Sequence, residues 1–93
     1  MDIHVTHNPA HSRFEVTIDD QLAVCDYRRD GQTLVLPHTL VPVALQGRGV
    51  AAQLVRAALE WARAEKLKVE PWCSYVASYM HRHPETRDLL AAP

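Results

Sequence analysis

The chain has 93 residues, a length that fits one domain near the small end of what folds unaided. An apolar fraction of 47% and a charged fraction of 23% are ordinary for a globular protein and exclude a largely disordered chain. The formal net charge of -1 provides no basic field that would favour a nucleic acid or an anionic membrane as a partner.

Four short strands are predicted in the first half of the chain, because apolar residues alternate with polar ones between turn signals. They lie around Ile3 and Val5 and over residues 14–18, 22–27 and 33–41. Asp30-Gly31 is a strong hairpin signal between the last two of these strands. Since proline cannot donate to a strand ladder, Pro37 predicts a bulge or a sheet edge inside the fourth strand.

One long helix is predicted over residues 50–66, where apolar residues recur at helical spacing. A fifth strand and two short helices follow, over residues 67–72, 75–81 and 84–90. Ser74 suits the N-cap of the first short helix, and Pro84 suits the first position of the second. The order predicts a single α+β domain: a mainly antiparallel, twisted sheet with one long helix packed on it and two short C-terminal helices.

The cysteine content bears on the compartment of the protein. Cys25 and Cys73 lie far apart in the sequence, with neither a CxxC spacing nor an obvious metal partner. A small secreted domain usually carries more cysteines as disulfides, so we expect reduced thiols, a cytoplasmic protein and no bound metal. No basic segment followed by an apolar run begins the chain, and no apolar run approaches the ~20 residues that span a bilayer. Neither a signal peptide nor a membrane span is expected.

The turn Gln46-Gly47-Arg48-Gly49 joins an extended apolar segment to the predicted long helix. Its two glycines permit backbone conformations closed to other residues and the close approach of a bulky anion. The first N–H groups of a helix lack partners within the helix, and the helix dipole favours negative charge beside them. These features predict a phosphate or other anion site, although a tight turn that merely begins a helix fits the same residues. The lysine of a P-loop is missing.

A longer pattern surrounds this turn. It consists of His38-Thr39-x-Val41-Pro42, Gly47-Arg48-Gly49, Trp72-Cys73 and His83-Pro84-Glu85. The segment from Gln46 to Ala51 resembles the Gln/Arg-x-x-Gly-x-Gly/Ala motif of the GNAT acetyltransferase superfamily, which cradles the diphosphate of acetyl-coenzyme A (acetyl-CoA). In its order and spacing, nearly the whole chain resembles the small GNAT-like proteins of about one hundred residues.

The resemblance implies a minimal acetyl-CoA-binding fold. The pantetheine arm would lie between splayed fourth and fifth strands, and Pro42 and Pro71 each remove a ladder donor near that gap. The cofactor-binding residues that it implies are Val43, Ala44 and Leu45 along the arm, then Gln46, Gly47, Arg48, Gly49, Val50 and Ala51 at the diphosphate turn. The implied activity is an acetyl-CoA-dependent N-acetyltransferase that acts on an amine.

Cysteine and tyrosine side chains offer chemistry for such a transfer. Cys73 would lie near the thioester and can accept the acetyl group, since thiol–thioester exchange is nearly isoenergetic, but it can equally be a small buried hydrophobe. Tyr75 and Tyr79 lie one turn apart on a predicted helix. Either hydroxyl can protonate the departing thiolate, as a tyrosine does in many GNAT enzymes, or it can anchor the helix to the sheet.

His38 is the fourth candidate for catalysis, as a base, and its alternative is a packed or hydrogen-bonded strand histidine. We expect it on the same strand face as Leu36 and Leu40. Leu40 stands where the family often carries Glu, so a carboxylate base is missing at that position.

The missing carboxylate keeps other functions open. One alternative is a non-catalytic coenzyme A or acyl-CoA-binding module, and another is a small interaction domain without a ligand. The chain also lacks the first helices and the substrate-recognition segment that larger acetyltransferases place after their first strand, so the acyl site is expected to be open. The expected partner is a small-molecule or peptide amine, with no nucleic acid or membrane, and the protein is expected to be a monomer or weak dimer.

Overall fold

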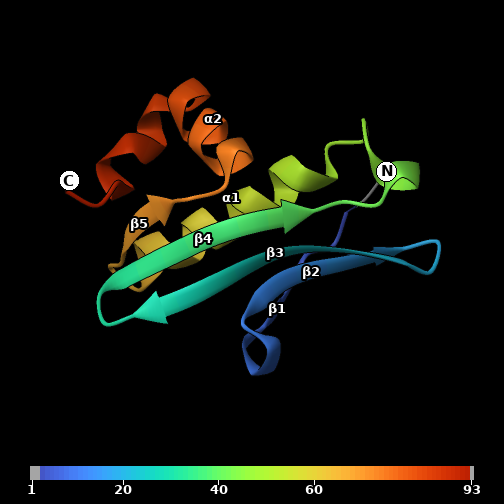
Figure 1. Ribbon diagram of the computed structural model, residues 1–93, viewed down its shortest axis with the longest axis horizontal. Helices are drawn as coiled ribbons and strands as arrows, with labels where there is room; N and C mark the ends of the chain where they lie inside the picture. The colour runs from blue at the N-terminus through green and yellow to red at the C-terminus, as the bar shows by residue number, and fades with distance from the viewer. Residues whose placement is uncertain (1–2, 93) are drawn as a thin grey trace.

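The computed structural model describes residues 3–92, in which five strands form one sheet (Figure 1). The strands are β1 (Thr6–Asn8), β2 (Arg13–Ile18), β3 (Gln21–Asp30), β4 (Thr33–Leu40) and β5 (Lys68–Pro71). The helices are α1 (Val50–Ala64) and α2 (Ser74–Arg82), with 3-10 turns at Pro9–His11, Val43–Leu45 and Pro84–Leu89. The α+β class, the long helix and the two short helical segments at the C-terminal end are therefore confirmed.

The sheet order follows the sequence, β1-β2-β3-β4-β5. Each of the first four strands is antiparallel to the next, and β5 runs parallel to β4. A parallel pair cannot be joined by a tight turn, and α1 provides the crossover between β4 and β5. The prediction of a mainly antiparallel sheet is confirmed.

A bulge at Pro37 divides β4 into two halves. Asp26 pairs with His38 whereas Arg28 pairs with Val35, so β4 carries one residue more than β3 across this interval. A bulge accommodates proline because the extra residue is left out of the ladder, where no N–H is needed. The prediction of a bulge or an edge at Pro37 is thus confirmed.

The bulge also changes which face of the sheet each residue of β4 occupies. Leu36, before the bulge, is fully buried in the core. After the bulge, Thr39 pairs with the buried Cys25 on the core face, and His38 therefore lies on the opposite face. The expectation that His38 shares a face with both Leu36 and Leu40 is wrong for Leu36, because the extra residue of the bulge shifts the alternation of side chains between the two faces by one position.

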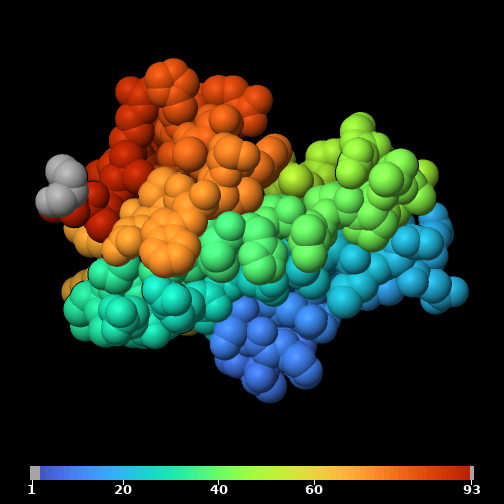
Figure 2. All heavy atoms as spheres, in the orientation of Figure 1, coloured from blue at the N-terminus to red at the C-terminus, as the bar shows by residue number. Residues whose placement is uncertain are grey.

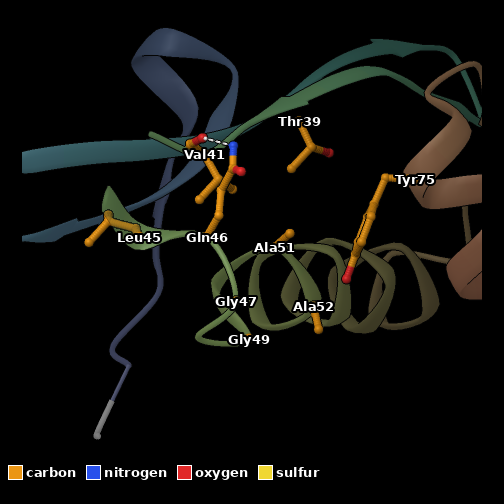
Figure 3. A pocket seen from close by; sticks show the side chains of 9 residues that line it. All are labelled: Thr39, Val41, Leu45, Gln46, Gly47, Gly49, Ala51, Ala52 and Tyr75. Carbon is orange, nitrogen blue, oxygen red and sulfur yellow. Dashed lines mark hydrogen bonds between the residues drawn. The ribbon is translucent and has the colours of Figure 1, made fainter. Parts of the chain in front are cut away.

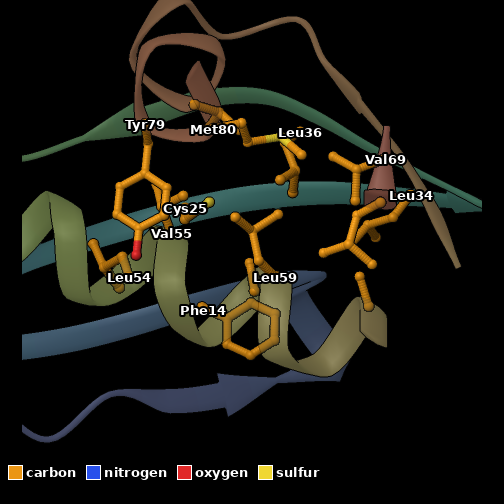
Figure 4. Packing of buried hydrophobic residues seen from close by; sticks show 14 of the residues in the cluster. Phe14, Cys25, Leu34, Leu36, Leu54, Val55, Leu59, Val69, Tyr79 and Met80 are labelled. Carbon is orange, nitrogen blue, oxygen red and sulfur yellow. The ribbon is translucent and has the colours of Figure 1, made fainter. Parts of the chain in front are cut away.

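The core lies between one face of the sheet and α1, and α2 closes its end (Figure 4). The predicted apolar stripe of α1 is confirmed, since Val50, Leu54 and Ala58 are all buried. In Figure 1 the opposite face of the sheet is turned toward the viewer, with α1 behind it. We call this the open face; it carries Arg13, Asp26, Arg28, His38, Leu40, Glu70 and Trp72. None of the helices in residues 3–92 is long and apolar enough to span a membrane.

Several element boundaries differ from those predicted, two of them at the first strand and at the end of the long helix. The first strand is Thr6–Asn8 rather than the segment around Ile3 and Val5, whose side chains pack against the core as partly buried residues. The long helix ends at Ala64, because Lys66 adopts a left-handed backbone with φ of 59° that turns the chain toward β5. Neither shift moves a residue of the candidate site.

Candidate functional site

The strands β4 and β5 part at the level of the bulge. Their pairing runs from Thr33 opposite Lys68 to Leu36 opposite Pro71. The backbone N–H of Cys73 then donates to the Leu36 carbonyl at 3.0 Å, and α2 begins. Within the described residues, the far half of β4 has no strand beside it on this edge. The predicted splay of the fourth and fifth strands is therefore confirmed.

A cavity of about 410 Å³ opens where the two strands part (Figure 3). It lies between the far half of β4, the start of α1 and the start of α2. The residues that line it are Thr39, Val41, Leu45, Gln46, Gly47, Gly49, Ala51, Ala52 and Tyr75. A cleft of this size is within the range of ligand sites in proteins, and we call it the groove.

The glycine turn forms one end of the groove. Gly47 and Gly49 have φ of 81° and 79°, a left-handed conformation that strains other residues. Gly49 is the N-cap of α1 and provides no side-chain hydrogen bond. The bond from Gln53 N–H to the Gly49 carbonyl begins the helix, so the N–H groups of Val50, Ala51 and Ala52 have no acceptor within it. These N–H groups can bind an anion at the mouth of the groove.

The residues that precede the turn are arranged differently from an extended strand. Val43–Leu45 is a 3-10 turn in which Leu45 N–H donates to the Pro42 carbonyl at 2.8 Å. Leu45 is buried and lines the groove, whereas Val43 and Ala44 are exposed. Gln46 donates through Nε2 to the Val41 carbonyl at 3.1 Å, which ties the turn to the end of β4. That residues 43–45 pair with a pantetheine arm stays a prediction.

Arg48 lies on the outer side of the turn. Its side chain is not among those that line the groove, and its Nη1 is 3.9 Å from an Asp19 carboxylate oxygen on the β2–β3 hairpin. Both side chains are exposed, so this ion pair is weak. The guanidinium is therefore available to an anion bound at the turn.

Cys73 lies beside the groove at its inner end, with Sγ 3.7 Å from Thr39 Oγ1. It is the N-cap residue of α2, so the prediction that Ser74 caps this helix is wrong. The bond from Cys73 N–H to Leu36 holds Cys73 in an extended conformation, and Ser74 is already helical. Partial burial raises the pKa of the Cys73 thiol, but N–H groups of the first helical turn and the Thr39 hydroxyl outweigh it and leave the pKa below its ordinary value.

The other cysteine is a core residue, as predicted. Cys25 is fully buried opposite Thr39, and burial raises the pKa of its thiol to about 11. Cys73 is therefore the accessible and more acidic thiol of the two.

The two tyrosines of α2 occupy different surroundings. Tyr75 lines the groove and points toward α1 beside Ala52 (Figure 3). Tyr79 is buried in the core, where its ring stacks on His83 with centroids 3.9 Å apart and burial raises its pKa (Figure 4). The structure therefore brings Tyr75, but not Tyr79, to the wall of the groove.

His38 lies on the open face, across β4 from the groove. Its Nε2 is 2.5 Å from Asp26 Oδ2, and the two side chains are 52% and 30% exposed. Sequence reasoning missed Thr39 as a residue of the groove and did not predict the contact between His38 and Asp26, because both depend on cross-strand register. Among residues 3–92, no cluster of His, Cys, Asp and Glu has the arrangement of a metal site.

Comparison with known proteins shows which family this chain is similar to. A family model described as GCN5-related N-acetyl-transferase matches residues 13–89. Protein NATD1 of Mus musculus is 36% identical over 85 residues, which cover 88% of this chain and 77% of that protein. Protein NATD1 of Homo sapiens is also 36% identical, with coverage of 88% and 75%. A Staphylococcus aureus protein described as GCN5-like, solved by NMR, shares the fold with a TM-score of 0.71 at 23% identity, over 97% of this chain and 89% of that one.

Proposed function

We propose that this chain, which belongs to the GCN5-related N-acetyltransferase family, binds acetyl-CoA in the groove and transfers its acetyl group to an amine. One observation carries the proposal. Gly49 begins α1 without a side-chain cap, so the first N–H groups of the helix have no acceptor within it, and Ala51 and Ala52 of its first turn line the groove. An anionic group with a slender chain attached to it, such as the diphosphate and pantetheine of acetyl-CoA, matches that combination.

The groove residues then have distinct roles in binding. The N–H groups of Val50 to Ala52, together with Arg48, hold the diphosphate, and the helix dipole adds about 0.3–1 kcal/mol at this end. The unpaired edge of β4 offers backbone groups to the pantetheine amides, as a neighbouring strand would. The thioester lies at the inner end of the groove, near Thr39 and Cys73, which are 3.7 Å apart.

Two groups at the inner end support the chemical step. Tyr75 lines the groove and gives a proton to the departing coenzyme A thiolate. Cys73, with its lowered pKa, is the residue that can take the acetyl group before the amine does. Both cysteines are free thiols, which suits the reducing cytoplasm as the compartment.

One observation favours a second function, a coenzyme A-binding module without turnover. Leu40 is 58% exposed on the open face and carries no acid at the position where the family often has one. Titration calorimetry and an assay of thiol release separate the two functions. The transfer proposal expects heat with acetyl-CoA and release of free thiol with an alkyl amine. Heat without thiol release from any amine in a broad panel would favour the module, and no heat at millimolar acetyl-CoA would refute both.

A further inference from the structure

A second cavity, of about 390 Å³, lies between α1, α2 and the Pro84–Leu89 turn. We propose that this cavity binds a free amino acid. The carboxylate of the amino acid contacts Arg56 and Tyr79, and its ammonium group contacts His83 and Glu85. None of the residues that line the groove also lines this cavity. The inference therefore concerns a separate site, and it does not rest on the transfer function proposed above.

The second cavity lies one helical turn further along the same two helices that bound the groove. Ala52 and Tyr75 line the groove, whereas Arg56 and Tyr79, each four residues later, line the second cavity. Its remaining wall is the Pro84–Leu89 turn, which follows directly on α2. Figure 2 shows α2 and this turn as one block, orange to red, that stands beside the strands.

The hydroxyl of Tyr79 is a hydrogen-bond donor without an acceptor in the described chain. The side chain is only 7% exposed and points toward α1 (Figure 4). Every fully buried side-chain nitrogen or oxygen in residues 3–92 has a partner, so this unpaired hydroxyl must be reached from the cavity. Burial raises the pKa of Tyr79 more than the nearby Arg56 lowers it, so the phenol keeps its proton and can donate.

Arg56 provides further donors on the α1 side of the cavity. Its Nε donates to Glu60 Oε1 at 3.0 Å, which orients the guanidinium and leaves both terminal nitrogens without a partner in the described chain. Two parallel N–H groups of a guanidinium match the two oxygens of a carboxylate. Arg56 and the Tyr79 hydroxyl together therefore fit one carboxylate.

The opposite wall offers acceptors in place of donors. His83 Nδ1 is 2.7 Å from the Tyr79 carbonyl oxygen, and a carbonyl only accepts, so Nδ1 carries the hydrogen. In the neutral ring the lone pair then lies on Nε2. Glu85 is exposed and forms no ion pair within residues 3–92. An ammonium group has three N–H donors and fits an imidazole nitrogen and a carboxylate together.

The rest of the lining narrows the class of ligand. Arg63 is already engaged, because its terminal nitrogens donate to both carboxylate oxygens of Asp88, at 2.8 and 2.9 Å. Leu59 and Leu89 are buried and add an apolar surface. A simple alkyl amine would leave the Tyr79 and Arg56 donors unpaired, and an inorganic anion would be repelled by Glu85. A free amino acid with an apolar side chain complements the donors, the acceptors and the apolar surface.

The test titrates isotope-labelled protein with L-leucine and follows the backbone amide signals by NMR. We expect the largest shifts in residues 56–63 and 79–89. N-acetyl-leucine lacks the ammonium group and leucine amide lacks the carboxylate, so each should bind about 10-fold more weakly than leucine or worse. No shifts at about 10 mM leucine, or shifts confined to the groove, would overturn the inference.

Two tyrosine variants provide a matched comparison, because Tyr79→Phe and Tyr75→Phe make the same chemical change one turn apart on α2. Tyr79→Phe should bind leucine about 10-fold more weakly and unfold near the wild-type temperature, since the lost hydroxyl has no partner in the described chain. Tyr75→Phe should bind leucine as the wild type does. Glu85→Gln, an exposed change, should also weaken binding by about 10-fold. Equal affinities of the two tyrosine variants for leucine would contradict the proposed contacts.

Competition with acetyl-CoA separates this site from the groove. Leucine should bind equally well with and without saturating acetyl-CoA. Displacement of leucine by acetyl-CoA would assign the cavity to the nucleotide end of the cofactor and refute the inference. A protein that binds leucine but not acetyl-CoA would refute the proposed function alone.

Discussion

Gly49→Asp tests whether the glycine turn is the anion site, and the chain contains a matched control for it. Gly49 and Gly31 both have positive φ, 79° and 62°, and at both positions an added Cβ would meet no atom within 4 Å. The left-handed backbone should therefore cost aspartate a similar free energy of folding at either position, about 1–2 kcal/mol. At position 49, the N-cap of α1, the helix dipole should offset about 0.3–1 kcal/mol of that cost. Gly31 lies in the β3–β4 hairpin, and it is not among the residues that line the groove.

The two variants should differ mainly in ligand binding. A carboxylate about 6 Å from a phosphate charge repels it by about 0.7 kcal/mol in a solvated setting, so a diphosphate with two charges loses about 1.4 kcal/mol. The side chain at position 49 also displaces the phosphate from one N–H group, and a hydrogen bond to a charged group contributes about 1.5–3 kcal/mol. A total near 3 kcal/mol corresponds to an affinity for acetyl-CoA that is roughly 100-fold weaker.

Titration calorimetry with acetyl-CoA measures this difference, and thermal unfolding without ligand measures the cost to the fold. We expect Gly31→Asp to bind within about threefold of the wild type. Gly49→Asp should unfold at the same temperature as Gly31→Asp or slightly above it, because its carboxylate lies at the N-terminus of α1. Equal dissociation constants for Gly49→Asp and Gly31→Asp would show that the turn does not hold the diphosphate.

Three other predictions follow from burial and side-chain contacts. Iodoacetamide should label Cys73 but not the buried Cys25 in the folded protein. Labelling of Cys73 should require a higher pH in Thr39→Val than in Thr39→Ser, because the Thr39 hydroxyl lowers the pKa of the thiol. Labelling of both variants at the same pH would show that the hydroxyl does not act on the thiol. Burial lowers the pKa of His7, so the unfolded chain binds this proton at a higher pH than the folded chain does. The free energy of unfolding of the wild type should therefore fall as pH drops below ~6.5. In urea unfolding, His7→Gln should lose less stability than the wild type over the same pH range. Leu54→Ala at a fully buried position of α1 should destabilise the protein by about 2–5 kcal/mol, and a loss under 1 kcal/mol in urea unfolding would contradict the packing described.

Local signals account for what could be predicted of the groove. The glycine turn was identifiable because positive φ at Gly47 and Gly49 is a property of those residues themselves. The bulge at Pro37 was identifiable for the same reason, since a missing N–H is a local fact. The sequence predicts Ser74 as the N-cap of α2, and this is wrong because the capping preference of serine is weaker than the tertiary hydrogen bond that holds Cys73 to Leu36.

The sequence by itself determined the order of the elements, the apolar stripe of α1 and the turn that exposes N–H groups at its start, because each depends on residues close together in the chain. Only the tertiary structure decided that His38 faces Asp26 on the open face while Thr39 faces the groove, and that Tyr75 rather than Tyr79 lines it. A bulge is visible in sequence as a proline, but the register on either side of it depends on how a distant strand pairs, and one residue of register exchanges the two faces.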